Sequence, residues 1–221
     1  MEDPVIETEN KVLGKTFFYM FLGLLATALV SWYIYASGYI NNLILGGTFR
    51  VMLVIELLVV IVFNLLFKKL PPIGVAILYF IYAFVNGVTF SVFFAVFELN
   101  SIIYLFFAAA VLFGIFAFMG YNSKKDLSSW SSYILPLLIV GLIVSLINLF
   151  VNNSMIDIIL DWFVLILFFG ITMYDMNKIK ELANSGIVEN DKVYIYGAME
   201  LYLDFINIFI RLLSIFGKRK D

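Results

Sequence analysis

Hydrophobic residues form seven long stretches along the chain, and short polar or charged segments separate them. About 20 mostly apolar residues are enough to cross the hydrocarbon core of a bilayer as an α-helix. The connections are short, so we predict one all-α, polytopic membrane domain over residues 1–221, with residues 1–15 as a short cytoplasmic tail. The predicted transmembrane helices are Thr16–Ala36, Arg50–Phe67, Ile73–Phe97, Ser101–Tyr121, Tyr133–Val151, Met155–Tyr174 and Val193–Gly217.

The last stretch, Val193–Gly217, differs from the others because it carries a stripe of polar side chains. At about 100° per residue these side chains share one face of a helix, about 80° wide. A charge near the bilayer centre costs ~2.5–3.5 kcal/mol or more, so the stripe must face protein or water. It is either a buried polar seam or the lining of an ion or proton path in a helix central to the bundle. Its members are Tyr196, Glu200, Asp204, Asn207, Arg211 and Ser214.

The composition narrows the class of protein further. Hydrophobic residues make up 63% of the chain, and the mean hydropathy of +1.03 is that of a membrane protein. The net charge is −2, which does not suit nucleic acid. There is no histidine, so a response to pH has to come from carboxyl groups. There is no cysteine either, which excludes disulfides and thiolate chemistry.

The distribution of lysine and arginine predicts how the chain is oriented. Membrane proteins keep an excess of these residues in their cytoplasmic loops. With the N-terminus in the cytoplasm, the outer loops before the last stretch hold only Arg50. The Lys-Arg-Lys run at 218–220 would then lie outside, so we expect the last stretch to cross fully rather than turn back. The inner segments would hold Lys11, Lys15, Lys68, Lys69, Lys124, Lys125, Lys178, Lys180 and Lys192.

Acidic residues inside the other stretches suggest partners for the polar stripe. Glu56 lies six residues from the outer end of the second stretch, and Arg211 lies six residues from Gly217. These depths match, so we expect an ion pair between Glu56 and Arg211, or separate partners for each. The excess of interior acids over this one arginine suits a cation or a proton.

Asp157, Asp161 and Asp175 share one face of the sixth stretch, and Asp157 is expected at its watery outer end. Asp175 reaches the depth of Asp204 only if the sixth helix continues beyond Tyr174. No helix-breaking residue stands before Gly186, so this continuation is allowed, although the charged segment 177–192 reads as a loop. Two acids that share a proton would titrate as a coupled pair.

Four segments resemble one family. They are NGVTFS (86–91), GYNSKKDLSSWSSY (120–133), GITMYDMNKIK (170–180) and ELYLDFINIFIRLLSIFG (200–217). In order and spacing they are similar to the bacterial branch of the Bax inhibitor family, also called transmembrane Bax inhibitor motif proteins. The resemblance implies seven helices with the last enclosed by the other six, in a bacterial plasma (inner) membrane.

The resemblance also implies a function, a calcium leak that responds to pH. By position Asp175 and Asp204 match the family's pair of sensor aspartates, which would share a proton and contact calcium. Glu56 matches its acidic position in the second helix. Family members often place an arginine near the inner end of that helix as a latch. This chain has Lys68 and Lys69 there, which lack the bidentate fork of arginine.

Competing functions remain open at this point. The leading one is a calcium leak gated by protonation of paired aspartates, with calcium as the transported ion and no cofactor. The alternative is a modulator or partner of a membrane-bound ATP-dependent AAA protease, which could grip the acidic N-terminal segment. A retinal protein is excluded because the last stretch has no lysine. No GxSxG or HExxH motif is present, so we do not expect an enzyme.

Overall fold

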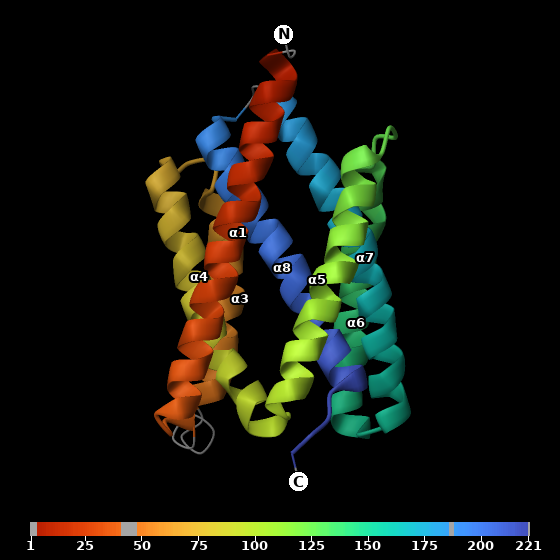
Figure 1. Ribbon diagram of the computed structural model, residues 1–221. Coiled ribbons are helices and arrows are strands. Elements are labelled where there is room, and N and C mark those ends of the chain that lie inside the picture. The colour runs from red at the N-terminus through yellow and green to blue at the C-terminus, as the bar shows by residue number, and fades with distance from the viewer. Residues whose placement is uncertain (1–3, 41–47, 186–187, 221) are drawn as a thin grey trace. The chain divides into compact units, whose positions relative to one another are not determined.

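The computed structural model describes residues 4–40, 48–185 and 188–220. These residues form seven α-helices and one short 3-10 helix (Figure 1). In a helix the backbone N–H and C=O groups bond to one another. A chain inside a bilayer requires this, because no water is there to pair with these groups. The predicted all-α class is confirmed. The helices are α1 (Pro4–Ala36), α3 (Thr48–Leu66), α4 (Pro72–Val96), α5 (Leu99–Asn122), η1 (Ser128–Trp130), α6 (Ser131–Val151), α7 (Ser154–Ser185) and α8 (Asn190–Phe216).

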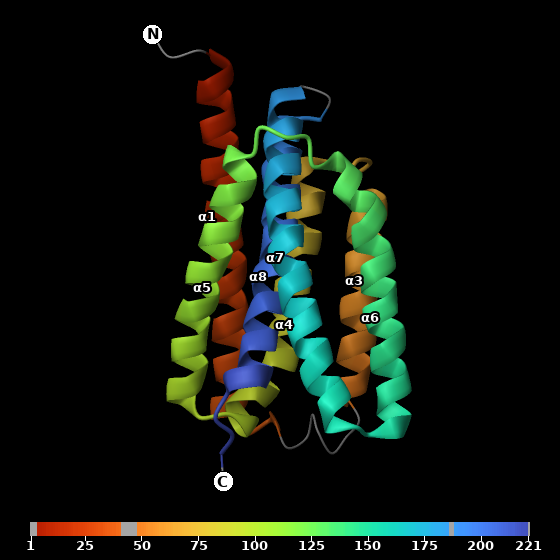
Figure 2. The same cartoon turned by 90° about the vertical axis from the view of Figure 1, so that its right-hand side faces the viewer.

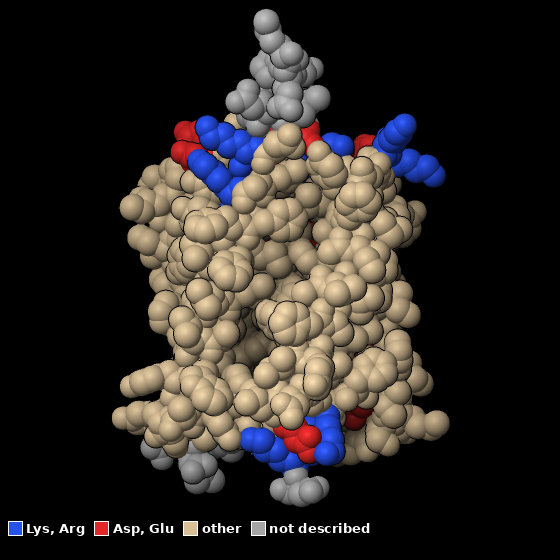
Figure 3. Space-filling view, in the orientation of Figure 1, with Lys and Arg blue, Asp and Glu red and all other residues tan. Residues whose placement is uncertain are grey.

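Each of the seven predicted stretches coincides with one of these α-helices. In the described part of the chain, five segments are long and apolar enough to cross a membrane by length and composition. Charged side chains gather at the ends of the helices, and the surface along the helices is formed by other residues (Figure 3). These features are those of a polytopic membrane protein. The five segments are Glu9–Ala36, Pro72–Val96, Leu99–Asn122, Ser128–Asn148 and Ser154–Ser185.

Two helices extend beyond the predicted apolar stretches. Helix α1 begins at Pro4, so most of the expected tail is helical, and residues 1–3 lie outside the described part. Helix α7 runs to Ser185, which confirms that it continues past Asp175. The predicted charged loop at 177–192 is therefore wrong over much of its length. The connection to α8 is residues 186–189, of which 186–187 lie outside the described part.

The chain divides into two compact units. The first unit holds α1, α3, α4, the end of α7, the beginning of α8 as far as Tyr202, and the C-terminal residues from Arg219. The second unit holds α5, η1, α6, α7 as far as Glu181, and the remainder of α8 from Leu203 to Lys218. Helices α7 and α8 therefore contribute residues to both units.

In the first unit α1 and α4 lie side by side because small residues let them approach (Figure 1). A β-carbon on Gly87 would lie 3.0 Å from the carbonyl oxygen of Thr27. The hydroxyl of Ser31 donates to the carbonyl oxygen of Gly87 at 2.8 Å. The hydroxyl of Thr27 lies 3.0 Å from the carbonyl oxygen of Ala83 and 2.6 Å from the hydroxyl of Tyr202. Small residues and interhelical hydroxyl bonds are typical of helix packing in membranes.

The first unit also shows where the last helix begins and where the chain ends. Near the start of α8, Asp191 pairs with Lys15 of α1 at 3.5 Å. Beyond the end of α8, the Nζ of Lys220 donates to the hydroxyl of Tyr35 at 2.9 Å and to the carbonyl oxygen of Phe94 at 2.7 Å. Lys15 and Tyr35 are about 30 Å apart along α1, at 1.5 Å per residue. The start of α8 and the residues that follow it therefore lie near opposite ends of α1. That the last stretch crosses the membrane fully stays a prediction.

In the second unit α6 runs antiparallel to α7 from a short connection at residues 152–153 (Figure 2). Asn152 ends α6 in the left-handed conformation, with φ of 52°. The side chain of Asn148 donates to the carbonyl oxygen of Asn153 at 3.0 Å and accepts from its N–H at 3.1 Å. This closes the turn, because the side chain satisfies backbone groups that the helix end leaves open.

Helix α5 packs closely on α7 within the same unit. A β-carbon on Gly120 would lie 2.3 Å from the carbonyl oxygen of Met173, so only glycine fits there. One turn away, the rings of Phe116 and Phe169 stack with centroids 4.3 Å apart. These contacts fix α7 against α5 just before Asp175.

Candidate functional site

Helix α8 is buried around most of its circumference. Between residues 193 and 213 all residues are buried except five that cluster on one arc of about 100°, at 3.6 residues per turn. This confirms that the helix is packed inside protein. The partly open arc coincides with the polar stripe, although Tyr196 and Asp204 on that stripe are buried. The five partly exposed residues are Glu200, Leu203, Asn207, Ile210 and Arg211.

The two aspartates predicted as sensors are both buried in the second unit. Asp175 on α7 is 5% exposed, and Asp204 on α8 is 2% exposed. Asp204 is followed by Phe205, whose ring contacts Phe106 and Phe113 of α5 with centroids 5.1 and 5.9 Å apart. Helix α5 thus supports both α7 and α8 near these acids. We call Asp175 and Asp204 the two buried aspartates.

The supporting residues around Asp175 on α7 are also polar and buried. Thr172 is fully buried, and its hydroxyl donates to the carbonyl oxygen of Phe168 at 2.8 Å. Asn177 is buried, and its Oδ1 accepts the backbone N–H of Leu127 at 3.4 Å. This bond connects the segment between α5 and η1 to α7, two residues beyond Asp175.

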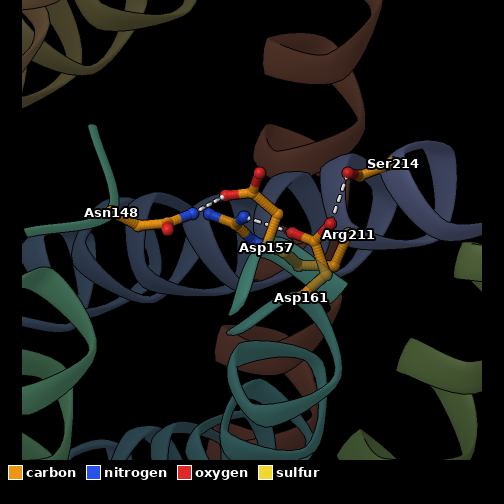
Figure 4. Close-up of polar contacts among 5 residues, drawn as sticks. All are labelled: Asn148, Asp157, Asp161, Arg211 and Ser214. Atoms are coloured by element: carbon orange, nitrogen blue, oxygen red, sulfur yellow. Dashed lines mark hydrogen bonds and ion pairs between the residues drawn. The ribbon is translucent and has the colours of Figure 1, made fainter. Parts of the chain in front are cut away.

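A second polar cluster joins α7 and the end of α8 (Figure 4). The Nη1 of Arg211 donates to Oδ1 of Asp161 at 2.6 Å, which makes a salt bridge. The hydroxyl of Ser214 donates to the other carboxylate oxygen of Asp161. The carboxylate is well enclosed, with 11% of the Asp161 side chain exposed against 32% for Arg211. We call Asp161, Arg211 and Ser214 the arginine cluster.

Asp157, one turn before Asp161, has a different partner. Its Oδ1 accepts a hydrogen bond from Nδ2 of Asn148 at 2.6 Å (Figure 4). Asp157 is exposed near the start of α7, which agrees with its expected place at the end of the helix. It therefore belongs to the turn between α6 and α7.

Of the two expectations for Glu56 and Arg211, the ion pair is wrong, and separate partners for each residue are confirmed. Arg211 pairs with Asp161, and Glu56 accepts a hydrogen bond from the hydroxyl of Thr89 on α4. The sequence held a signal for the actual pair. Asp161 lies six residues from Met155, the same spacing that separates Arg211 from Gly217.

The remaining predicted residues lie as follows. Asn207 is half-buried and donates to the carbonyl oxygen of Leu203 at 2.8 Å, within its own helix. Glu200 is half-buried on the same arc. Lys68 and Lys69 are exposed just beyond α3, and the Nζ of Lys68 lies 5.7 Å from the ring centroid of Phe67. A latch from these lysines to the aspartates stays a prediction.

Within the described residues, no three acidic side chains lie close enough together to form a candidate metal site. The chain has no histidine or cysteine to complete one. Calcium prefers six to eight oxygen ligands when it is held in a resident site. Contact between calcium and the two buried aspartates therefore remains a prediction about an ion in passage.

These observations define the class first, a multi-pass α-helical membrane protein with acidic groups buried in its last two helices. The chain belongs to the Bax inhibitor family, because residues 9–221 match the family model described as "Inhibitor of apoptosis-promoting Bax1". The resemblance seen in its motifs is thus confirmed.

Bacterial relatives align with almost the whole chain. The inner membrane protein YbhL of Escherichia coli (strain K12) is 33% identical over 214 residues, covering 94% of this chain and 92% of the relative. An uncharacterized protein of Deinococcus radiodurans is 32% identical, covering 100% and 95%. An uncharacterized membrane protein of Streptococcus pyogenes serotype M3 is 31% identical, covering 99% of each. These relatives and the apolar helices support a bacterial multi-pass membrane protein.

Proposed function

We propose that this protein is a calcium leak of the bacterial plasma membrane, in which protonation of Asp175 and Asp204 sets the flux. The observation that supports the proposal best is the burial of both carboxyl groups on α7 and α8 within one unit. Ionisable groups inside a membrane protein are expensive to keep, and they mark ion and proton paths.

The chemistry of a buried carboxyl group suits this role. Its ionised form is stabilised by a cation, and carboxylate oxygens are preferred ligands of calcium. Protonation removes the negative charge and with it the attraction for the cation. A change of protonation can also shift a two-state helix arrangement, provided that the two states differ in their affinity for the proton.

The partly open arc of α8 supports the same proposal. Glu200, Asn207 and Arg211 give this arc polar groups on both sides of Asp204 along the helix. A polar face that is half-buried suits contact with water or ions better than a sealed seam does. The interpretation of the stripe as a path is therefore preferred to a purely structural one.

The experiment is calcium entry into liposomes that contain the purified protein, measured between about pH 5 and 9. We expect the flux of the parent protein to depend on pH. Asp204→Asn should flatten the profile, and Asp175→Asn should flatten or shift it. Asp157→Asn is the matched control, since it removes an exposed carboxyl from α7, and it should keep the parent's profile.

Two results would contradict the leak. One is a parent protein whose calcium flux equals that of empty liposomes. The other is a parental pH profile in both Asp175→Asn and Asp204→Asn. Either result would favour the alternative proposal, a modulator of a membrane-bound AAA protease.

That alternative makes its own prediction about the start of the chain. Helix α1 begins at Pro4, and Glu9 is buried and accepts a hydrogen bond from Asn184 at 2.7 Å. A protease that gripped this end would have to unwind the first turns of α1. Deleting residues 2–8, which precede Glu9, should abolish modulation of the protease but leave a leak in liposomes intact.

A further inference from the structure

A groove in the second unit lies between η1 and α6 on one side and α7 on the other. Its volume is about 510 Å³, within the range of pockets that hold small molecules. Trp130, Tyr133 and Leu137 line one wall, and Ile166 and Gly170 line the other. The lining is almost entirely apolar, so the groove suits a hydrocarbon chain.

The groove borders a part of the molecule that is open to the bilayer. The span Ser128–Asn148, which covers η1 and most of α6, is 6% buried over its apolar window, against 44% for α4. Tyr133 and Leu137 are exposed at 69% and 39%. Trp130 and Tyr133 stand at the first turns of the span, where aromatic side chains favour the membrane–water interface.

The segment just before the groove carries exposed positive charge. Lys124 and Lys125 are exposed and lie between α5 and η1. The segment is fixed in place, because Leu127 is buried and its N–H bonds to Asn177 of α7. The carboxylate of Asp126 forms a local turn, in which its Oδ1 accepts a hydrogen bond from the backbone N–H of Ser128 at 2.7 Å.

That backbone N–H holds the pKa of Asp126 below its usual range. The aspartate is therefore ionised at neutral pH and offsets one of the two lysines. Farther along α7, Lys180 is engaged within the protein, because its Nζ donates to the carbonyl oxygen of Tyr121 at 3.0 Å. The segment still presents a net positive charge beside an apolar groove.

We propose that this groove binds an anionic phospholipid, with an acyl chain between α6 and α7 and the phosphate near Lys124 and Lys125. The proposal rests on two features together, the positive charge of the two lysines and the apolar groove beside them. Basic pockets between transmembrane helices bind anionic lipid headgroups, and each lysine near the surface adds to the attraction. The bilayer itself supplies the occupant, because the groove is exposed on the least buried of the five apolar spans found in the described part of the chain.

Native mass spectrometry of the full chain in detergent, titrated with phosphatidylglycerol or with phosphatidylcholine, tests this proposal. We expect phosphatidylglycerol to bind more tightly. Lys124→Gln combined with Lys125→Gln should weaken phosphatidylglycerol binding by roughly tenfold or more and leave phosphatidylcholine binding unchanged. Ile166→Trp should fill the groove and weaken binding of both lipids.

Two control variants separate the site from general effects. Lys218→Gln combined with Arg219→Gln removes the same charge from the C-terminal segment and should bind both lipids like the parent. Val111→Trp places tryptophan on an outward face of α5, where Val111 is 63% exposed against 62% for Ile166. It should also bind both lipids like the parent.

Three outcomes would overturn the proposal. The first is equal affinity of the parent for the two lipids. The second is parental phosphatidylglycerol binding after both loop lysines are replaced. The third is parental binding after Ile166→Trp, which would show that the groove does not hold the acyl chain.

Discussion

Arg211 of α8 and Asp161 of α7 form a salt bridge of 2.6 Å. The same two helices carry the two buried aspartates. Ser214, one turn beyond Arg211, donates to the second oxygen of the same carboxylate. The aspartate is more deeply buried than the arginine, so it depends on both donors. Removing one member of a buried pair leaves the other without compensation, which is strongly destabilising.

The arginine cluster therefore predicts a coupled stability effect. Asp161→Asn and Arg211→Gln should each lower the free energy of unfolding by about 2–4 kcal/mol, somewhat less than for a fully buried pair. The double variant should lose less than the sum of the single losses, by about 1 kcal/mol or more. Thermal unfolding in detergent measures all three.

Glu56 provides the control for this comparison of single and double variants. Its carboxylate accepts from Thr89, so Glu56→Gln and Arg211→Gln should have additive effects. Coupling between Glu56 and Arg211, together with additivity between Asp161 and Arg211, would contradict the structure.

The contact between α5 and α7 predicts different effects for two glycines of the same helix. Gly120→Ala would press a β-carbon against the backbone of Met173 and should destabilise the protein by about 1–3 kcal/mol. Gly114 has no neighbouring atom within 4 Å of such a carbon. Gly114→Ala should therefore be neutral or stabilising, by up to about 1 kcal/mol, because alanine favours helix. Melting temperatures compare the two, and equal losses would show that the tight approach is absent.

The hydroxyl pair of Thr27 and Tyr202 predicts a hydrogen-bond contribution in the first unit. Tyr202 is fully buried, so Tyr202→Phe should cost about 1–2 kcal/mol of unfolding free energy. Tyr104→Phe removes a hydroxyl from a side chain that is 75% exposed and should change the melting temperature little. A similar shift in both variants would mean that the buried hydroxyl contributes nothing specific.

The distribution of lysines predicts the orientation of the chain in the membrane. Cysteine labelling can test it, because the chain has no cysteine and each introduced cysteine is its only thiol. Lys69→Cys and Lys125→Cys should react with a membrane-impermeant maleimide only after the cells are opened. Lys218→Cys should react in intact spheroplasts, because it would lie on the outer side. The reverse pattern would place the N-terminus outside.

Hydropathy alone predicted the positions of the helices because the bilayer sets a minimum apolar length. The start of α1 and the end of α7 were harder to predict. Hydropathy indicates which residues are apolar enough for lipid, but a helix can continue beyond them. The segment from Asn177 to Ser185 is polar but contains no glycine or proline, and α7 continues through it. The absence of a helix breaker was the better guide there.

The partner of Arg211 could not be decided from the sequence, because depth does not distinguish the candidates. Glu56 and Asp161 each lie six residues from the end of their predicted stretch, as Arg211 does. Choosing between them requires knowing which helix faces the arginine, and that depends on packing of side chains such as Trp162 against Phe216. The two buried aspartates, by contrast, were identified from motif position, and both are buried.

The position of Lys220 beside Tyr35 has a consequence for how the protein is made. Helix α8 carries Glu200, Asp204 and Arg211, and in the predicted orientation the basic residues that follow it would also have to pass through the membrane. Such a segment partitions poorly into lipid by itself. In that orientation its crossing would depend on helices that are already in place. Newly made chains that stalled before this step would lack the inserted helix that bears Asp204.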